Sequence, residues 1–109
     1  MNLNDFVSNV KGRPGAYFGA RKMSSLFDIG FFIEGYEYAK RTVGQEDGFD
    51  KFFRSEFPKF VRKKLNDDPL NFEFWFETID RYANDSDEAA NMFFSFFEEF
   101  YAMYESKTE

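Results

Sequence analysis

The chain has 109 residues and a formal net charge of −6, and 23% of its residues are aromatic, with 18 phenylalanines. It contains no cysteine and no histidine, which excludes disulfides, thiolate zinc sites, cysteine nucleophiles and the usual histidine general base. The length predicts one domain, residues 1–109, and the aromatic content predicts a core large enough to fold without cross-links.

The charge is distributed unevenly along the chain. Residues 1–66 contain 12 Lys and Arg against 8 Asp and Glu, whereas residues 67–109 contain 2 against 12. This acidic second part disfavours nucleic acid as its partner and favours a basic protein, because complementary charge speeds association and suppresses wrong partners. The alternative interpretation is that the acidic residues only keep a phenylalanine-rich domain soluble.

The first of five expected helices is short, near residues 4–10. The second begins at Ser24 or Ser25, either of which can cap it, and runs to about Thr42. A helix that is apolar on two faces is usually central. This one has two apolar stripes, which contain Leu26, Ile29, Phe32, Ile33 and Tyr36 in one, and Phe27, Phe31 and Tyr38 in the other.

The third helix follows GQEDG and carries apolar residues at spacings of three and four. Because proline removes a backbone donor, Pro58 predicts a kink or break inside this helix. The fourth helix is expected over about 71–83, after a turn at NDDPLN. Its residues separate into an apolar face, Phe72, Trp75, Phe76, Ile79 and Tyr82, and an acidic face, Glu73, Glu77 and Asp80.

The fifth helix opens at NDSDE, where Asp85 and Glu88 have the spacing of a capping box, and runs to about Glu105. It is expected to be the most buried long helix, through an apolar arc of Met92, Phe93, Phe96, Phe97, Phe100, Met103 and Tyr104. No strand is expected. The predicted fold is therefore all-α, a compact single-domain bundle of about five helices with a Phe-rich core.

No catalytic, metal or cofactor site is expected. One helix could project three carboxylates, Glu73, Glu77 and Asp80, toward a single metal ion. However, no second acidic triplet matches them, as a di-metal centre would need. The favoured interpretation is a solvated or partner-binding face. NDSDE lacks the glycine and the distal glutamate of a calcium-binding EF-hand loop, so it is interpreted as a helix cap. The chain is not expected to be an enzyme.

The glycine-rich stretch GRPGAYFGARK, residues 12–22, could be mistaken for a phosphate-binding loop. A P-loop needs Lys and Ser or Thr after its last glycine, whereas Gly19 is followed by Ala20 and Arg21. Pro14 and Gly15 suit the centre of a type II turn. A structural loop is the favoured interpretation, and direct contact with a ligand is the alternative.

Neither nucleic acid nor a membrane is an expected partner. The one nucleic-acid-like patch is the basic run Lys59, Arg62, Lys63 and Lys64, but the sequence pI is about 4.7 and no recognised binding motif accompanies it. No apolar run approaches the roughly 20 residues needed to span a bilayer. The N-terminus lacks the basic start and apolar run of a signal peptide, so a cytoplasmic location is expected.

The stretch Arg13, Pro14, Gly15, Ala16, Tyr17, Phe18, Gly19 resembles the R-P-G-x-Y-x-G signature of small all-α bacterial immunity proteins encoded beside polymorphic toxins. Arg13, Pro14, Gly15, Tyr17 and Gly19 match this structural loop, whereas Ala16 and Phe18 stand where Met and Leu are frequent. The resemblance extends loosely over most of the chain, but only the loop is specific. It implies a cytoplasmic antitoxin of contact-dependent inhibition or a related system, with no catalytic residues.

Such a protein would bind the C-terminal domain of its cognate toxin as a monomer in a 1:1 complex. The expected mechanism is to place carboxylates where the substrate phosphates of a basic nuclease lie and to block its site. Direct and allosteric inhibition both remain open. The candidate surface is the acidic face of the fourth helix with Phe74 beside it, and it contains Asp67, Asp68, Glu73, Phe74, Glu77, Asp80, Asp85 and Asp87.

Two alternatives accompany this surface. Phe74 could instead contact a neighbouring helix, and Glu77 could pair with Arg81 four residues later. A second functional hypothesis is a helical adaptor or regulatory subunit that binds its partner, or itself, through Phe27, Phe31 and Tyr38.

Overall fold

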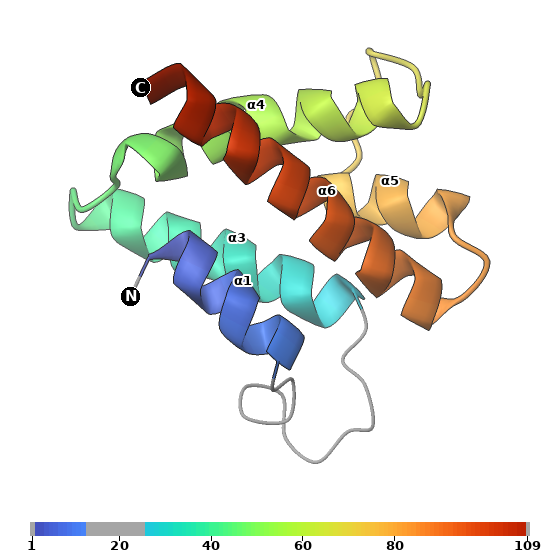
Figure 1. Ribbon diagram of the computed structural model, residues 1–109, viewed down its shortest axis with the longest axis horizontal. Helices are drawn as coiled ribbons and strands as arrows, with labels where there is room; N and C mark the ends of the chain where they lie inside the picture. Colours follow the sequence, from blue (N-terminus) through green and yellow to red (C-terminus); the bar gives the residue numbers. More distant parts are fainter. Residues whose placement is uncertain (1, 13–25, 109) are drawn as a thin grey trace.

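All the secondary structure in the described part of the chain is helical (Figure 1). The computed structural model describes residues 2–12 and 26–108. These form five helices: α1 (Leu3–Gly12), α3 (Leu26–Thr42), α4 (Gly48–Lys64), α5 (Trp75–Tyr82) and α6 (Ser86–Thr108). The all-α prediction is confirmed. The loop signature Arg13 to Gly19 and the expected caps Ser24 and Ser25 lie outside the described residues.

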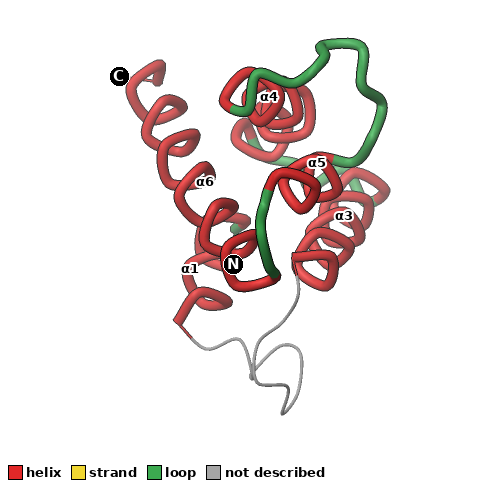
Figure 2. The backbone as a smooth tube through the Cα atoms, turned by 90° about the vertical axis from the view of Figure 1, so that its right-hand side faces the viewer, coloured by secondary structure: helices red, strands yellow, loops and turns green. Residues whose placement is uncertain are grey.

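The helices form two layers, which are separated most clearly in the side view of Figure 2. One layer contains α1 and α6, and the other contains α3, α5 and α4. The short helix α5 contacts α3, α4 and α6, so it occupies the centre of the bundle. The radius of gyration is 13.7 Å, close to the value of about 13 Å typical of a compact domain of this size.

The core is built mainly from aromatic rings of α4, α5 and α6. Phe57 is fully buried, and its ring centroid lies 5.1 Å from that of Phe100 and 5.2 Å from that of Trp75. Both pairs meet edge to face, an arrangement worth about 0.5–1.5 kcal/mol beyond the burial of area. The buried rings at the centre are Phe49, Phe53, Phe57, Trp75, Phe76, Phe93, Phe97 and Phe100.

Helix α4 continues through Pro58, so of the kink or break that the sequence predicts, the break does not occur. Proline at this position removes the bond to the carbonyl of Arg54. Arg54 is exposed, so water can donate a hydrogen bond to its carbonyl oxygen instead. Phe57 and Val61, on either side of the proline, are fully buried. The packing of these two residues holds both turns in one helix.

Helix α5 begins at Trp75, four residues later than the sequence predicts. The side chain of Asn71 accepts a hydrogen bond from the backbone N–H of Glu73 at 2.8 Å, and Phe74 has an extended backbone. A side chain that satisfies the backbone locally competes with helix formation. Phe72 is 96% exposed in the loop instead of lying on the apolar face of a helix.

Helix α3 is not the central helix, contrary to expectation. Its second stripe stays largely exposed, with 57% of Phe31 and 62% of Tyr38 accessible. The eight residues of α5 span about 12 Å, against about 25 Å for the seventeen residues of α3, so α5 cannot cover the whole stripe. The two helices approach closely at Gly30, where a Cβ would overlap the ring of Phe76.

Helix α6 agrees in part with its predicted arc. Phe93, Phe97 and Phe100 are buried, but Met103 is exposed, and Phe94, outside the arc, is buried. The expected cap is present, because the N–H of Glu88 donates to Asp85 Oδ1 at 2.8 Å.

Candidate partner-binding surface

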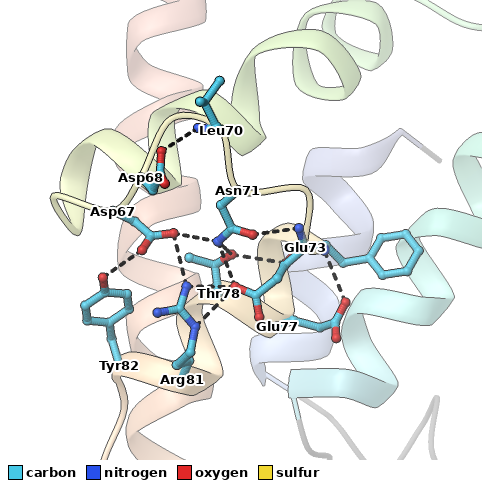
Figure 3. A network of polar contacts seen from close by, with 10 residues as sticks. Asp67, Asp68, Leu70, Asn71, Glu73, Glu77, Thr78, Arg81 and Tyr82 are labelled. Carbon is cyan, nitrogen blue, oxygen red and sulfur yellow. Dashed lines mark hydrogen bonds and ion pairs between the residues drawn. The ribbon is translucent and has the colours of Figure 1, made fainter.

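The loop between α4 and α5 is held by the side chain of Asn71. Its amide donates to Asp67 Oδ2 at 2.6 Å and to Glu73 Oε1 at 2.7 Å, and it lies 3.3 Å from Thr78 Oγ1 (Figure 3). Asn71 therefore joins two carboxylates that are six residues apart in the chain and fixes them at the start of α5.

Arg81 completes this group from the last turn of α5. Its Nη2 donates to Asp67 Oδ2 at 3.1 Å and to Glu73 Oε1 at 2.7 Å, and the hydroxyl of Tyr82 donates to Asp67 Oδ1 at 2.8 Å (Figure 3). We call Asp67, Asn71, Glu73, Arg81 and Tyr82 the acidic network. Arg81 thus bonds to Glu73 and Asp67, and no pair between Arg81 and Glu77 is present.

These contacts change the acid–base properties of the acidic network. The hydrogen bonds from Asn71 and Tyr82, with that from Arg81, lower the pKa of Asp67 to about 2. The bonds from Arg81 and Asn71 also lower the pKa of Glu73, and the same two carboxylates raise the pKa of Arg81. Both carboxylates are ionised at neutral pH, but Arg81 offsets part of their charge.

The other carboxylates predicted for the surface have separate local roles or none. Asp68 accepts the N–H of Leu70 at 2.8 Å and stabilises the turn, Glu77 accepts the N–H of Phe74 at 3.1 Å, and Asp85 caps α6. Among the described residues, Asp80 and Asp87 have no hydrogen-bonding or ion-pair partner for their side chains. These two have charge that is not already engaged within the fold.

The expectation that Glu73, Glu77 and Asp80 share one face of a helix is wrong. Glu73 precedes α5 and is turned toward Arg81, whereas Glu77 and Asp80 lie on the helix. Within residues 2–12 and 26–108, no three side chains of the kinds that bind metal ions are grouped to hold one.

Phe74 lies between these carboxylates and helix α3. It is 48% exposed, its ring stacks on Phe76 at 5.1 Å, and it meets the edge of Phe31 at 6.0 Å. The ring therefore contacts a neighbouring helix and also remains accessible. Phe31, Tyr38 and Phe74 are three partly exposed rings, which we call the aromatic patch.

A hollow of about 210 Å³ lies between α3, α4 and the start of α5. Tyr38 and Phe74 line it, so two members of the aromatic patch meet there. Trp75 lies in its wall, and the indole Nε1–H donates to Glu34 Oε1 at 3.1 Å. The remaining lining residues are Glu37, Arg41, Phe53, Arg54, Pro58 and Glu73.

A buried charged cluster adjoins this hollow. Lys40 Nζ lies 2.7 Å from Oδ2 of Asp50, which is fully buried, and Asp50 Oδ2 also accepts the N–H of Asp47 at 2.9 Å in the capping box of α4. Burial opposes ionisation of Asp50, but the bond from Lys40 outweighs it and lowers the pKa of Asp50. Asp50 is therefore a carboxylate that links α3 to α4.

Glu37 lies beside this pair and is only 5% exposed. No donor among the described residues bonds to either of its carboxyl oxygens. Burial, and after it the nearby charge of Asp50, raises the pKa of Glu37 to about 8, so it is protonated at neutral pH and can donate to Asp50. Lys40 pairs with Asp50 and Asp47 and does not contact the carboxyl group of Glu37.

Sequence reasoning did not identify Glu37 or Asp50. A signal was present, since Glu37 follows Ile29 and Ile33 at four-residue spacing and so continues the buried stripe of α3. A charged residue in register with a buried stripe indicates a buried charge with a specific partner.

The basic run predicted as a nucleic-acid-like patch lies at the C-terminal end of α4. Lys59 Nζ lies 3.2 Å from Glu56 Oε2, and Lys64 Nζ lies 3.0 Å from Glu99 Oε2 on α6. These pairs reduce the local positive charge. None of the helices formed by the described residues has the length and apolar character required to cross a membrane.

Comparisons of the chain with protein-family models, with curated proteins and with solved structures give no match. The candidate surface therefore rests on its own geometry: two rings of the aromatic patch, Tyr38 and Phe74, line a hollow, and Glu73 and Glu77 lie beside Phe74.

Proposed function

We propose that the chain is an immunity protein, a non-enzymatic antitoxin that acts in the cytoplasm and binds the C-terminal domain of a cognate toxin. The observation that carries the proposal is that two surface features, an aromatic one and an acidic one, adjoin each other. The aromatic patch, through Phe74, lies directly beside the carboxylates of the α4–α5 loop and α5. Interfaces concentrate binding energy in accessible aromatic anchors, and carboxylates around them suit a basic partner.

The acidic second part of the chain supports a toxin with a basic active site, such as a nuclease. The R-P-G-x-Y-x-G resemblance favours immunity over other binding roles. In this mechanism the aromatic patch provides contact area, while Asp80 and Asp87 provide negative charge that the fold leaves unpaired. Binding then blocks the site by charge complementarity and steric occlusion, in a 1:1 complex with a monomer.

One observation also favours an adaptor or regulatory subunit. Phe31 and Tyr38, which that hypothesis uses, adjoin Phe74, so the two hypotheses share one surface and differ only in the partner. Capture of the tagged protein from its native cells, followed by mass spectrometry, distinguishes them. A toxin domain encoded beside its gene, recovered at near 1:1 stoichiometry, is the expected result. A housekeeping protein at that stoichiometry would replace immunity with the adaptor role.

The surface itself is tested with variants of the same chain. Tyr38→Ala combined with Phe74→Ala should weaken partner binding by at least tenfold, while the helical circular-dichroism signal is retained. Phe72→Ala is the matched control, because Phe72 is an exposed ring of the same loop that does not line the hollow. An equal loss in the control would place the binding surface elsewhere.

A further inference from the structure

We propose that the groove between α4 and α6 is a second binding surface, which takes an acidic amphipathic helix of another protein. The groove has a volume of about 550 Å³ and consists of an apolar floor between basic edges. The inference does not rest on the proposed function, because none of the groove residues belongs to the aromatic patch or to the acidic network.

The floor of the groove is apolar and elongated. The rings of Phe52 and Phe60 both pack on that of Phe100, with centroid distances of 4.8 and 5.4 Å, and both remain partly exposed. Met103 adds a thioether that is 39% exposed. Phe52 and Phe60 are eight residues apart on α4, so the floor extends for about 12 Å along this helix. A floor of this length suits a ligand with a continuous apolar stripe.

The edges of the groove are positively charged. They contain four lysines, Lys59, Lys63, Lys64 and Lys107, against two acids, Glu56 and Glu99. Lys59 pairs with Glu56 and Lys64 pairs with Glu99. Among the described residues Lys63 has no acidic partner, and Lys107 has only the ring of Phe52, whose centroid lies 5.0 Å from its Nζ. The groove therefore keeps two positive charges in excess, although the net charge of the chain is −6, and it complements an acidic partner.

The positions of the lysines favour a helix over a smaller anion. Lys107 lies against Phe52 at one end of the floor, whereas Lys63 lies past Phe60, in the last turn of α4, at the other end. A fatty acid has one carboxylate and would reach only one of these ends. An amphipathic helix carries carboxylates along both flanks of its apolar stripe, so it pairs with both lysines while the stripe covers the floor.

A nucleic acid fits the groove less well than an acidic helix. The carboxylates of Glu56 and Glu99 lie among the lysines and repel phosphates. A helix can place an apolar or neutral residue opposite each of them. The lysines also suit a helical partner, because their methylene stems lie along apolar surface while the ammonium groups stay in water and follow its flanks.

The groove lies on the other side of α4 from the hollow that the aromatic patch lines. The buried stripe of α4, which contains Phe57, separates the two: Arg54 and Pro58 lie on one side of it, and Glu56 and Lys63 lie on the other. Figure 2 shows α6 and α3 on different sides of α4. A helix in the groove therefore leaves the aromatic patch accessible to the first partner.

The test uses a fluorescein-labelled designed peptide of about 14 residues, which spans about 21 Å as a helix. Leucines at helical spacings of three and four form one face, and glutamate and alanine occupy the other positions. Fluorescence anisotropy with the full chain should show saturable 1:1 binding with a Kd of about 1–100 μM at low salt. Binding should weaken about tenfold in 0.5 M salt, where exposed charges are screened. A peptide of the same composition whose leucines do not share a face is the control and should bind at least about tenfold more weakly.

Matched variants locate the peptide. Lys63→Glu and Lys107→Glu, at opposite ends of the floor, should each weaken binding by about tenfold at low salt. Lys51→Glu makes the same charge change at an exposed lysine of α4 outside the groove, and it should bind normally. Met103→Gln should weaken binding several-fold without any change of charge. These residues are exposed, so the helical circular-dichroism signal should be retained in all four variants.

Several outcomes would overturn the proposal. One is the absence of saturable binding up to about 1 mM peptide at low salt, and others are equal affinity for the control peptide or an equal loss in Lys51→Glu. Displacement of the peptide by equimolar sodium dodecanoate would make a lipid carboxylate the occupant, and displacement by equimolar single-stranded RNA would make the groove a polyanion surface.

The groove and the proposed function are tested separately. Tyr38→Ala combined with Phe74→Ala should leave the peptide affinity unchanged, and a loss there would place the peptide on the aromatic patch and overturn the groove. A chain that binds the peptide but captures no toxin removes only the immunity role. A chain that captures its toxin but does not bind the peptide removes only the groove.

Discussion

Asp67 in the acidic network and Glu37 beside the hollow are two carboxyl groups whose protonation differs. Asp67 is partly buried, whereas Glu37 is only 5% exposed. The pKa of Asp67 is lowered to about 2, whereas the pKa of Glu37 is raised to about 8. At Glu37 burial, and after it the charge of Asp50, raises the pKa, and no described group donates to its oxygens. At Asp67 the hydrogen bonds from Asn71 and Tyr82 outweigh the effect of burial.

The comparison shows that burial and local hydrogen-bond donors together determine whether a carboxyl group ionises. In the acidic network two carboxylates share the single positive charge of Arg81. Hydrogen bonds from the neutral side chains of Asn71 and Tyr82 stabilise the remaining negative charge. In the buried cluster Lys40 pairs with Asp50 and Arg54 pairs with Glu46, so burial dominates at Glu37 and this acid keeps its proton. The network stabilises a loop, while the buried cluster links α3 to α4.

The largest expected effect is loss of the buried ion pair. Asp50→Ala leaves Lys40 without its partner and the N–H of Asp47 without its acceptor, and we expect a loss of about 3–4 kcal/mol in the free energy of unfolding. Urea unfolding followed by circular dichroism measures it. Asp47→Ala is the matched control, since it removes the other half of the capping box and only a longer contact with Lys40 at 4.0 Å, and it should cost about 1 kcal/mol. Equal losses would mean that the Lys40–Asp50 pair adds nothing beyond the cap.

The next effect is the pH dependence caused by Glu37. Its pKa is raised from 4.5 to about 8 on folding, so between these values the folded state holds one more proton than the unfolded state. This stabilisation is complete below about pH 4.5 and is lost as pH rises through about 8. We expect the free energy of unfolding to fall by about 2–3 kcal/mol between pH 6 and pH 9.

Urea unfolding at a series of pH values measures this dependence, and Glu37→Gln should remove most of it. A slope that is the same in the wild type and in Glu37→Gln would show that Glu37 is not the group that titrates.

A smaller effect is expected in the acidic network. Arg81→Met removes the cation shared by Asp67 and Glu73, and the pKa of both carboxyl groups should rise toward ordinary values. Carbon-13 NMR titration of the carboxyl signals measures this directly. The unfolding midpoint should decrease less than in Asp50→Ala. The decrease relative to the wild type should be smaller in 0.5 M salt, because exposed ion pairs are screened at roughly this ionic strength. An unchanged pKa for Asp67 would assign its shift to Asn71 and Tyr82 alone.

The smallest effect on stability is expected for carboxylates outside both clusters. Asp80→Lys combined with Asp87→Lys should change the free energy of unfolding by no more than about 0.5 kcal/mol per site. The same variant should associate with a basic partner about tenfold more slowly at low salt, as measured by stopped-flow fluorescence. The difference should largely disappear at high salt, and an unaffected association rate would remove these two residues from the surface.

Helical periodicity predicted most of the fold. Apolar residues at spacings of three and four located the helices, and the Asp85 cap on Glu88 is present. The periodicity could not locate the start of α5, because a hydrogen bond from the backbone of Glu73 to the side chain of Asn71 competes with the helix there. Nor could it reveal that Pro58 is tolerated, which depends on the buried packing of Phe57 and Val61.

The candidate site was less predictable than the fold. Sequence reasoning selected Phe74, which belongs to the aromatic patch, and Glu77, which accepts the N–H of Phe74. It could not identify Arg81 as the shared partner of Asp67 and Glu73, since those contacts span 14 and 8 residues. It also treated Phe31 and Tyr38 as a separate surface, because only the contact of α3 with the start of α5 joins them to Phe74.

The sequence by itself determined the all-α class, the positions of most helices and the aromatic character of the core. Each of these follows from interactions among residues a few positions apart and from composition. Only the tertiary structure decided which carboxylates are neutralised, that Glu37 is buried without a donor, and that Phe31 and Tyr38 on α3 remain exposed. These features depend on distances between side chains of different helices, which the packing of the helices sets and local spacing does not.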